Sequence, residues 1–230
     1  LSACLAEAGQ HVMLVDFDPQ GNASSGLGVE KEDYEHTVYD MMAEEADLDE
    51  CLVKNIQDNL DVLPSDMNLA GAEIEFQEVE DKETLLKRYL DKVRDNYDFI
   101  LIDCPPSLNI LTINALTAAD TVLVPIQCEY YALEGLNQVL KTVELVKRKL
   151  NPQLELEGVV FTMYDARTNL SLQVVESVKN NLNQTIYKTI IPRNVRLAEA
   201  PSHGMPINLY DTRSTGAESY RMLAAEVMSR

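Results

Sequence analysis

Three aspartates follow two apolar stretches of the chain, and their positions could support metal-dependent chemistry. Residues 11–15 lead into Asp16 and Asp18, and residues 99–102 lead into Asp103. Short apolar runs bounded by turn residues are typical of buried parallel strands, and open α/β sheets bind ligands at the carboxyl ends of their strands. We therefore expect the three carboxylates at one edge of a sheet. Carboxylates that act together with phosphate oxygens and water are typical ligands of the Mg²⁺ that accompanies a nucleotide.

Each aspartate also has a purely structural interpretation. Asp16 and Asp18 could hydrogen-bond the turn that follows them, since aspartate is common in turns. Asp103 could be the N-cap of a helix that begins after the next two prolines, and Ser107 is expected to cap that helix. The residue types alone leave both interpretations open.

The remaining pattern is an alternation of apolar strands and amphipathic helices. Strands are expected over 11–15, 60–63, 99–103, 121–126, 158–163 and 187–191. Helices are expected over 1–9, 38–43, 68–76, 85–93, 108–119, 133–151, 172–182 and 216–230. Strands that alternate with helices predict an α/β fold whose mostly parallel, twisted sheet is covered by helices on both faces. No linker-like segment interrupts this pattern, so we expect one domain over residues 1–230.

The composition is that of an ordinary soluble globular protein. The 230 residues are 46% hydrophobic and 25% charged, with a formal net charge of −19. No apolar run is long enough to span a bilayer and no basic-then-apolar leader opens the chain, so we expect no membrane contact and a cytoplasmic location. The negative charge argues against general coating of nucleic acid, and any DNA contact must use a local basic patch. The four cysteines lack CxxC spacing and are expected to be free thiols.

Five segments of the chain, taken in order, resemble the ParA/Soj chromosome- and plasmid-partitioning ATPases, which belong to the MinD-like group of deviant Walker A P-loop proteins. The segments are residues 16–22, 102–107, 127–135, 165–169 and 191–204. Each segment alone is a weak signal, whereas five in the same order are specific. The resemblance covers essentially the whole chain and implies a P-loop NTPase-like fold with ATP and Mg²⁺ as cofactors.

The resemblance also implies roles for particular residues. Asp18 would be catalytic, because it would position or polarise the water that attacks ATP, and Asp16 would support the metal region. Asp103 would be the Walker B carboxylate, which holds Mg²⁺ through its water shell. Pro192 and Asn194 would lie against the adenine.

The resemblance further implies a DNA-binding switch. Proteins of this family form a homodimer with ATP, and the dimer binds DNA non-specifically. Arg167 and Arg196 correspond to the arginines that contact DNA. A ParB-like partner would trigger hydrolysis and release, and the protein would be associated with the nucleoid. Dimerisation doubles a local basic patch, which reconciles DNA binding with the net charge of −19.

One family feature is absent from the 230 residues. Members carry a glycine-rich phosphate loop with two lysines, but no G-x-x-x-x-G-K-[ST] motif occurs here. We expect the corresponding strand, loop and half-helix, on the order of twenty residues, immediately upstream of Leu1. Without an inner strand the sheet should expose unpaired backbone or rearrange, and the chain as given should be unable to hydrolyse ATP.

Other functions on the same scaffold remain open from the sequence. A MinD-like membrane-associated positioning ATPase would need a basic amphipathic tail, which residues 216–230 do not clearly supply. An ATP-dependent ligase is possible, as is an iron-sulfur reductase that uses Cys104 and Cys128. A naturally truncated chain could instead be an interaction module that binds no ATP.

Overall fold

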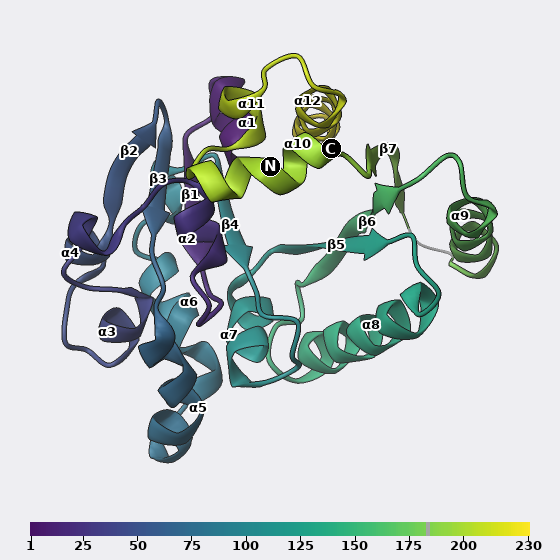
Figure 1. The fold of residues 1–230 in the computed structure, drawn as a ribbon. Helices are drawn as coiled ribbons and strands as arrows, with labels where there is room; N and C mark the ends of the chain where they lie inside the picture. The colour runs from purple at the N-terminus through teal and green to yellow at the C-terminus, as the bar shows by residue number, and fades with distance from the viewer. Residues whose placement is uncertain (183–184) are drawn as a thin grey trace.

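The parallel strands expected from the sequence form two sheets in the computed structural model, which describes residues 1–182 and 185–230 (Figure 1). The first sheet has the order β2-β3-β1-β4 and the second has the order β5-β6-β7. The strands are β1 (Val12–Asp16), β2 (Val53–Gln57), β3 (Leu60–Leu63), β4 (Phe99–Asp103), β5 (Thr121–Gln127), β6 (Glu155–Tyr164) and β7 (Ile186–Pro192).

The strand pairing is mostly parallel, as predicted. β1 runs parallel to both β3 and β4, and β6 runs parallel to both β5 and β7. Among the described strands, only β2 and β3 pair in an antiparallel manner. β2 is absent from the predicted elements, because Asn55 adopts a positive φ of 56° and the register with β3 shifts around it. This irregularity breaks the two-residue alternation by which an edge strand is recognised.

The sequence pattern predicts one sheet, whereas the structure has two. β4 pairs with β1, and β5 pairs with β6, but within the described residues neither strand has a partner on its other edge. The middle of β4 is half-buried and its last residue is exposed, whereas every residue of β1 is buried. Unpaired strand edges leave backbone N–H and C=O groups available to another strand.

Twelve α-helices are described. They are α1 (Ser2–Glu7), α2 (Asn22–Gly26), α3 (Val38–Met42), α4 (Leu48–Cys51), α5 (Ala72–Glu75), α6 (Leu85–Leu90), α7 (Ile110–Ala118), α8 (Ala132–Lys149), α9 (Asn169–Asn181), α10 (Val195–Glu199), α11 (Ile207–Tyr210) and α12 (Thr215–Met228). Six described 3-10 turns join them: η1 (Lys31–Asp33), η2 (Met67–Gly71), η3 (Phe76–Glu78), η4 (Lys82–Thr84), η5 (Arg94–Asn96) and η6 (Ala200–His203). The helix predicted over 68–76 is therefore broken into η2, α5 and the start of η3.

Helices cover both faces of each sheet. On the first sheet, α3, α6 and α7 pack against the face that carries Met13 and Val15, and α1 and α12 pack against the face that carries Val12 and Leu14. On the second sheet, α8 and α9 cover one face, and Leu223 of α12 packs on the other. α12 therefore bridges the two sheets, which confirms that residues 216–230 form a packed helix (Figure 1).

The start of α7 corrects two predictions about capping. Asn109 is the N-cap, and its Oδ1 accepts hydrogen bonds from the backbone N–H groups of Leu111 (3.1 Å) and Thr112 (3.2 Å). The prediction that Ser107 caps this helix is wrong, because the helix begins later than the two prolines suggested. The same finding excludes Asp103 as the N-cap of α7.

No helix in the described part of the chain combines the length and the apolar character that crossing a membrane requires.

Candidate functional site

The carboxylates at the ends of β1 and β4 converge at one edge of the first sheet. Asp16 and Asp103 are direct partners in the parallel register, and the Phe17 N–H donates a 2.8 Å hydrogen bond to the Asp103 carbonyl. The sequence pattern predicts this convergence, because parallel strands present their carboxyl ends at the same edge.

Asp16 is completely buried and hydrogen-bonded. Its Oδ2 accepts from both the backbone N–H and the hydroxyl of Ser24, each at 2.7 Å, and its Oδ1 accepts from the Asp18 N–H at 3.3 Å. Burial raises the pKa of Asp16, while the hydrogen bonds from Ser24 and Asp18 oppose that rise. The side chain therefore joins the end of β1 to the first turn of α2.

Asp18 lies in the loop between β1 and α2. Its Oδ1 accepts a 2.9 Å hydrogen bond from the Gln20 N–H, so it does stabilise a turn, as the structural interpretation expects. Gly21 has a φ of +63°, and an added Cβ there would lie 3.0 Å from the Ser65 carbonyl oxygen. The loop is thus packed tightly against the segment after β3. This packing holds the half-buried Asp18 near the sheet edge that carries Asp16 and Asp103, which we call the carboxylate edge.

Asp103 presents an exposed carboxylate at the end of β4. Desolvation by the surrounding protein and, to a lesser extent, the negative charges of Asp16 and Asp18 together raise its pKa to about 6. Such a group gains from a nearby cation. No group of three or more Asp, Glu, His or Cys side chains within the described residues could hold a metal ion. Any Mg²⁺ here would therefore complete its shell with water and phosphate oxygens, which is the usual arrangement for this ion.

The two cysteines considered for an iron-sulfur site belong to different sheets. Cys104 follows β4 and Cys128 follows β5. Burial and the neighbouring Asp103 raise the pKa of Cys104 to about 12, and burial also raises the pKa of Cys128.

The segment after β7 packs against α2, and α2 in turn is hydrogen-bonded to Asp16 at the carboxylate edge. Pro192 ends β7, and Asn194 is the N-cap of α10, with its Oδ1 accepting from the Arg196 N–H at 2.8 Å. The Asn194 amide also donates to Thr215 Oγ1 at 2.7 Å. Further on, an added Cβ on Gly28 would lie only 2.7 Å from the Gly204 carbonyl oxygen. This backbone contact holds η6 against the end of α2, whose start is bonded to Asp16.

A cavity of about 180 Å³ lies between α1, α2 and the segment from α10 to α12. Asn208 lines it and is buried, and its Oδ1 has no hydrogen-bond partner in the described structure. The residues that line the cavity are Leu1, Ser2, Ala3, Cys4, Gly26, Leu27, Leu197, Ala200, Pro201, Met205, Pro206, Ile207, Asn208 and Tyr220. Pro192 and Asn194 lie outside this lining, so the structure does not bring them into the same cavity.

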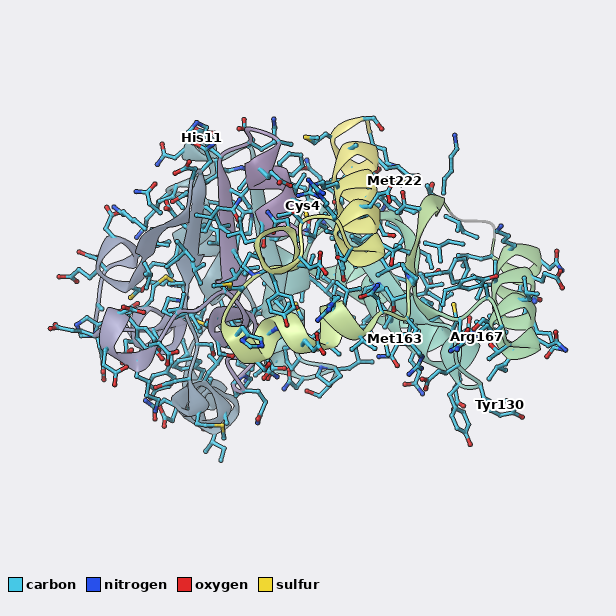
Figure 2. The ribbon with its side chains drawn as sticks, turned by 45° about the horizontal axis from the view of Figure 1, so that its top comes forward. Cys4, His11, Tyr130, Met163, Arg167 and Met222 are labelled. Carbon is cyan, nitrogen blue, oxygen red and sulfur yellow. The ribbon has the colours of Figure 1, made fainter. Side chains whose placement is uncertain are left out.

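Both predicted DNA-binding arginines are engaged by acidic neighbours. Arg167, in the loop after β6, forms a two-point contact with Asp165 at 2.9 and 2.7 Å. Arg196, on α10, contacts Glu199 at 2.8 Å and Asp211 at 3.4 Å. Figure 2 shows Arg167 at the end of the molecule formed by the second sheet. The two arginines come from different elements, the loop between β6 and α9 and the helix α10.

Ser24 is absent from the residues predicted from the sequence, although it makes two of the three contacts to Asp16. The available signal was a serine in the first turn of a short helix directly after the aspartate loop. Its significance depends on the fold of that loop, which spacing alone does not give.

Comparisons with known proteins identify the family of the chain. The family model described as an AAA domain matches residues 1–156. The chain is 60% identical over 227 residues to the sporulation initiation inhibitor protein Soj of Bacillus subtilis, covering 99% of this chain and 90% of that protein. It is 48% identical to the chromosome partitioning protein ParA of Caulobacter vibrioides, covering 100% of this chain and 87% of that protein.

A solved structure supports the same fold. The cobyrinic acid a,c-diamide synthase of Mycobacterium smegmatis with bound ADP and magnesium has a TM-score of 0.85 at 35% identity, covering 97% of this chain and 84% of that one. The fold and the carboxylate edge therefore define a P-loop NTPase-type α/β protein, and nucleotide and magnesium binding occur within this fold family. At 60% identity over nearly its full length, the chain belongs to the Soj/ParA family of chromosome-partitioning ATPases.

Proposed function

We propose that this protein is an ATP-dependent switch that partitions chromosomal or plasmid DNA. The observation that carries the proposal is the 60% identity to Soj, which extends over 99% of the chain. ATP would promote a homodimer, the dimer would bind DNA non-specifically on the nucleoid, and a ParB-like partner would trigger hydrolysis and release. Such coupling requires that the nucleotide states differ in their affinity for DNA.

Asp103 would hold Mg²⁺ at the carboxylate edge. The fit rests on its exposed position and its raised pKa, because a cation would relieve the repulsion from Asp16 and Asp18. When bound, Mg²⁺ neutralises phosphate charge during phosphoryl transfer. Asp18 would orient the attacking water from the tightly packed loop. Asp16, which is buried and hydrogen-bonded, would support that loop.

The phosphate side of the site needs residues other than those described. The 230 residues contain no G-x-x-x-x-G-K-[ST] motif, so they provide no loop of that type to surround the phosphates. The unpaired edges of β4 and β5 would accept one more strand, and a phosphate loop that followed such a strand would emerge beside Asp103. The 230-residue chain alone would accordingly bind ATP weakly.

The segment after β7 would contact the adenine. Pro192 and Asn194 remain the residues proposed for this role by family resemblance, although Asn194 also caps α10. The neighbouring cavity adds an acceptor, Asn208 Oδ1, that is buried without a partner in the described structure. An exocyclic amino group such as that of adenine is a donor suited to this oxygen.

Arg167 and Arg196 would contact DNA phosphates in the dimer. A dimer presents two copies of each arginine, which increases the number of phosphate contacts. Arg167 and both members of the Arg196–Glu199 pair are exposed, and exposed ion pairs are worth little in water, so phosphate can replace the carboxylate.

The test uses the full-length gene product and DNA without a specific sequence. Retention on DNA is measured with ATP, with ADP and without nucleotide, and the same assay is run with D18A. We expect retention only with ATP, and we expect D18A to remain bound because it cannot hydrolyse ATP. Equal retention with and without ATP would overturn the switch. The 230-residue chain serves as the comparison. Strong ATP binding by this chain would contradict the proposal that the phosphates are bound by residues outside it.

Two other functions have distinct outcomes. A MinD-like protein would sediment with liposomes in the presence of ATP and would not be retained on DNA. A ligase related to the diamide synthase would consume ATP in proportion to an amide product, but the 35% identity to that enzyme is well below the 60% identity to Soj. An interaction module would show no nucleotide response in any form of the chain.

A further inference from the structure

Asp16 depends on Ser24 for most of its hydrogen bonding. The Asp16 side chain is completely buried, and a buried carboxylate is costly unless donors surround it. Both contacts to Oδ2 come from Ser24, one from its backbone and one from its hydroxyl, each at 2.7 Å. The Ser24 side chain is itself buried and faces no competing solvent.

The same contacts also position the loop that carries Asp18. The other Asp16 oxygen, Oδ1, accepts the Asp18 N–H at 3.3 Å, so one carboxylate joins Ser24 to the backbone of Asp18. The loop has little freedom to compensate, because Gly21 is left-handed and packs closely on the Ser65 carbonyl. A rotation of the Asp16 carboxylate would therefore be passed on to Asp18.

We propose that Ser24 is a positioning residue which orients the Asp16 carboxylate and, through it, the Asp18 loop that faces Asp103. This inference rests on the proposed ATPase function and adds a residue to it. Ser24 touches neither nucleotide nor metal in this role. Its effect on the reaction passes through the hydrogen bonds to Asp16.

Replacing the hydroxyl separates positioning from binding. In the full-length protein, S24A leaves Asp16 with one donor fewer, and we expect kcat for ATP hydrolysis to fall by about tenfold to a hundredfold while KM for ATP changes little. S24T restores a hydroxyl and should recover most of kcat. S25A is the matched control, because the Ser25 hydroxyl is exposed and bonds only the Asn22 carbonyl, at 3.4 Å; its kcat should equal that of the parent protein.

A readout that does not depend on activity is the pKa of Asp16. Carboxyl-carbon NMR of selectively labelled protein, assigned with D16N, should show that S24A raises the pKa of Asp16, because a hydrogen bond that favours its charged form is lost. If S24A fails to fold, Ser24→Cys keeps the shape with a weaker donor and takes its place.

An unchanged kcat together with an unchanged Asp16 pKa in S24A would overturn the inference. A folded S24T that shows no recovery of kcat would also overturn it, since the hydroxyl would then not be the cause. If the parent protein neither binds nor hydrolyses ATP, the proposed function fails instead. In that case the pKa comparison still decides whether Ser24 orients Asp16.

Discussion

Asp103 links the candidate metal site to the stability of the protein. Its pKa is about 6 in the folded chain, compared with about 4 for an unperturbed aspartate. Because the folded value is higher, the folded state holds this proton more tightly than the unfolded state. The free energy of unfolding should therefore fall as the pH rises from about 4 to about 6, as the linkage relation requires.

D103N removes this dependence. Without Mg²⁺ at pH 7.5 we expect the variant to melt about 1–2 °C above the parent protein, a small effect because the carboxylate is exposed. The difference should shrink at pH 4, where the parent carboxyl is mostly protonated. Thermal melts followed by circular dichroism at both pH values measure this. A lower melting temperature for D103N at pH 7.5 would show that the charge of Asp103 does not destabilise the folded chain.

Asp165 offsets the positive charge of Arg167, the residue proposed to contact DNA phosphates. Their two-point contact lowers the pKa of Asp165 to about 2, chiefly through the side-chain hydrogen bonds from Arg167. D165N keeps an acceptor for the Arg167 backbone but removes the charge. We expect DNA affinity of the ATP-bound protein to increase by about two- to fivefold at low salt, which is the range expected for an exposed ion pair.

Fluorescence anisotropy over a series of salt concentrations checks this prediction. D49N is the matched control, because it removes one charge from the exposed pair between Asp49 of α4 and Lys54 of β2. R167A should weaken DNA binding. It should also reduce the slope of log affinity against log salt concentration by about one for each arginine removed, because each arginine contributes about one phosphate contact. If R167A binds DNA as well as the parent protein, Arg167 is not a DNA contact.

At the scale of elements, Glu226 of α12 closes the outer edge of β7. Its carboxylate accepts the backbone N–H groups of Lys188 (2.9 Å) and Thr189 (3.0 Å) and the Thr189 hydroxyl (2.9 Å). Desolvation raises the pKa of Glu226, but these hydrogen bonds outweigh that effect and leave the pKa lowered. A helix side chain thus satisfies strand groups that would otherwise be an open template for another strand.

E226A should reduce the free energy of unfolding by about 2–3 kcal/mol, the range for hydrogen bonds to a charged group. Since the folded pKa is lowered, the contribution of Glu226 is present above the unfolded value near pH 4.3 and is lost as the pH falls through the lower folded value. Urea unfolding at pH 7 and pH 3 measures both effects. E176A, on the exposed side of α9, is the control and should change stability little.

At the scale of the molecule, β4 and β5 each have one edge without a strand partner in the described residues. In the 230-residue chain, amide protons on the outer edge of β4 should exchange faster than those of β1, which pairs on both sides. Hydrogen exchange measured by mass spectrometry or NMR tests this. If the full-length gene product adds a strand at this position, β4 and β5 should both become protected, and ATP binding should appear with that protection. Equal protection of β4 and β1 in the 230-residue chain would contradict an open edge.

The sequence predicted the elements best where the local residue pattern matches the structure that the segment adopts in the fold. Parallel strands ending in aspartates, the helices between them and the packed final helix all followed from apolar periodicity and turn residues. Predictions failed at positions where a few residues decide a local geometry. Asn109 rather than Ser107 caps α7, the bulge at Asn55 hides β2, and 68–76 divides into short turns. Capping and bulges depend on one or two dihedral angles, which periodicity does not encode.

The sequence by itself determined the family, the mostly parallel α/β class and the convergence of Asp16, Asp18 and Asp103, because the alternation of strands and helices places the strand ends together. Only the tertiary structure decided how each carboxylate is held. It buries Asp16 against Ser24, leaves Asp103 exposed with a raised pKa and engages Arg167 with Asp165. Burial, hydrogen bonding and charge proximity arise between segments far apart in the chain or at the ends of turns, so spacing along the sequence cannot specify them.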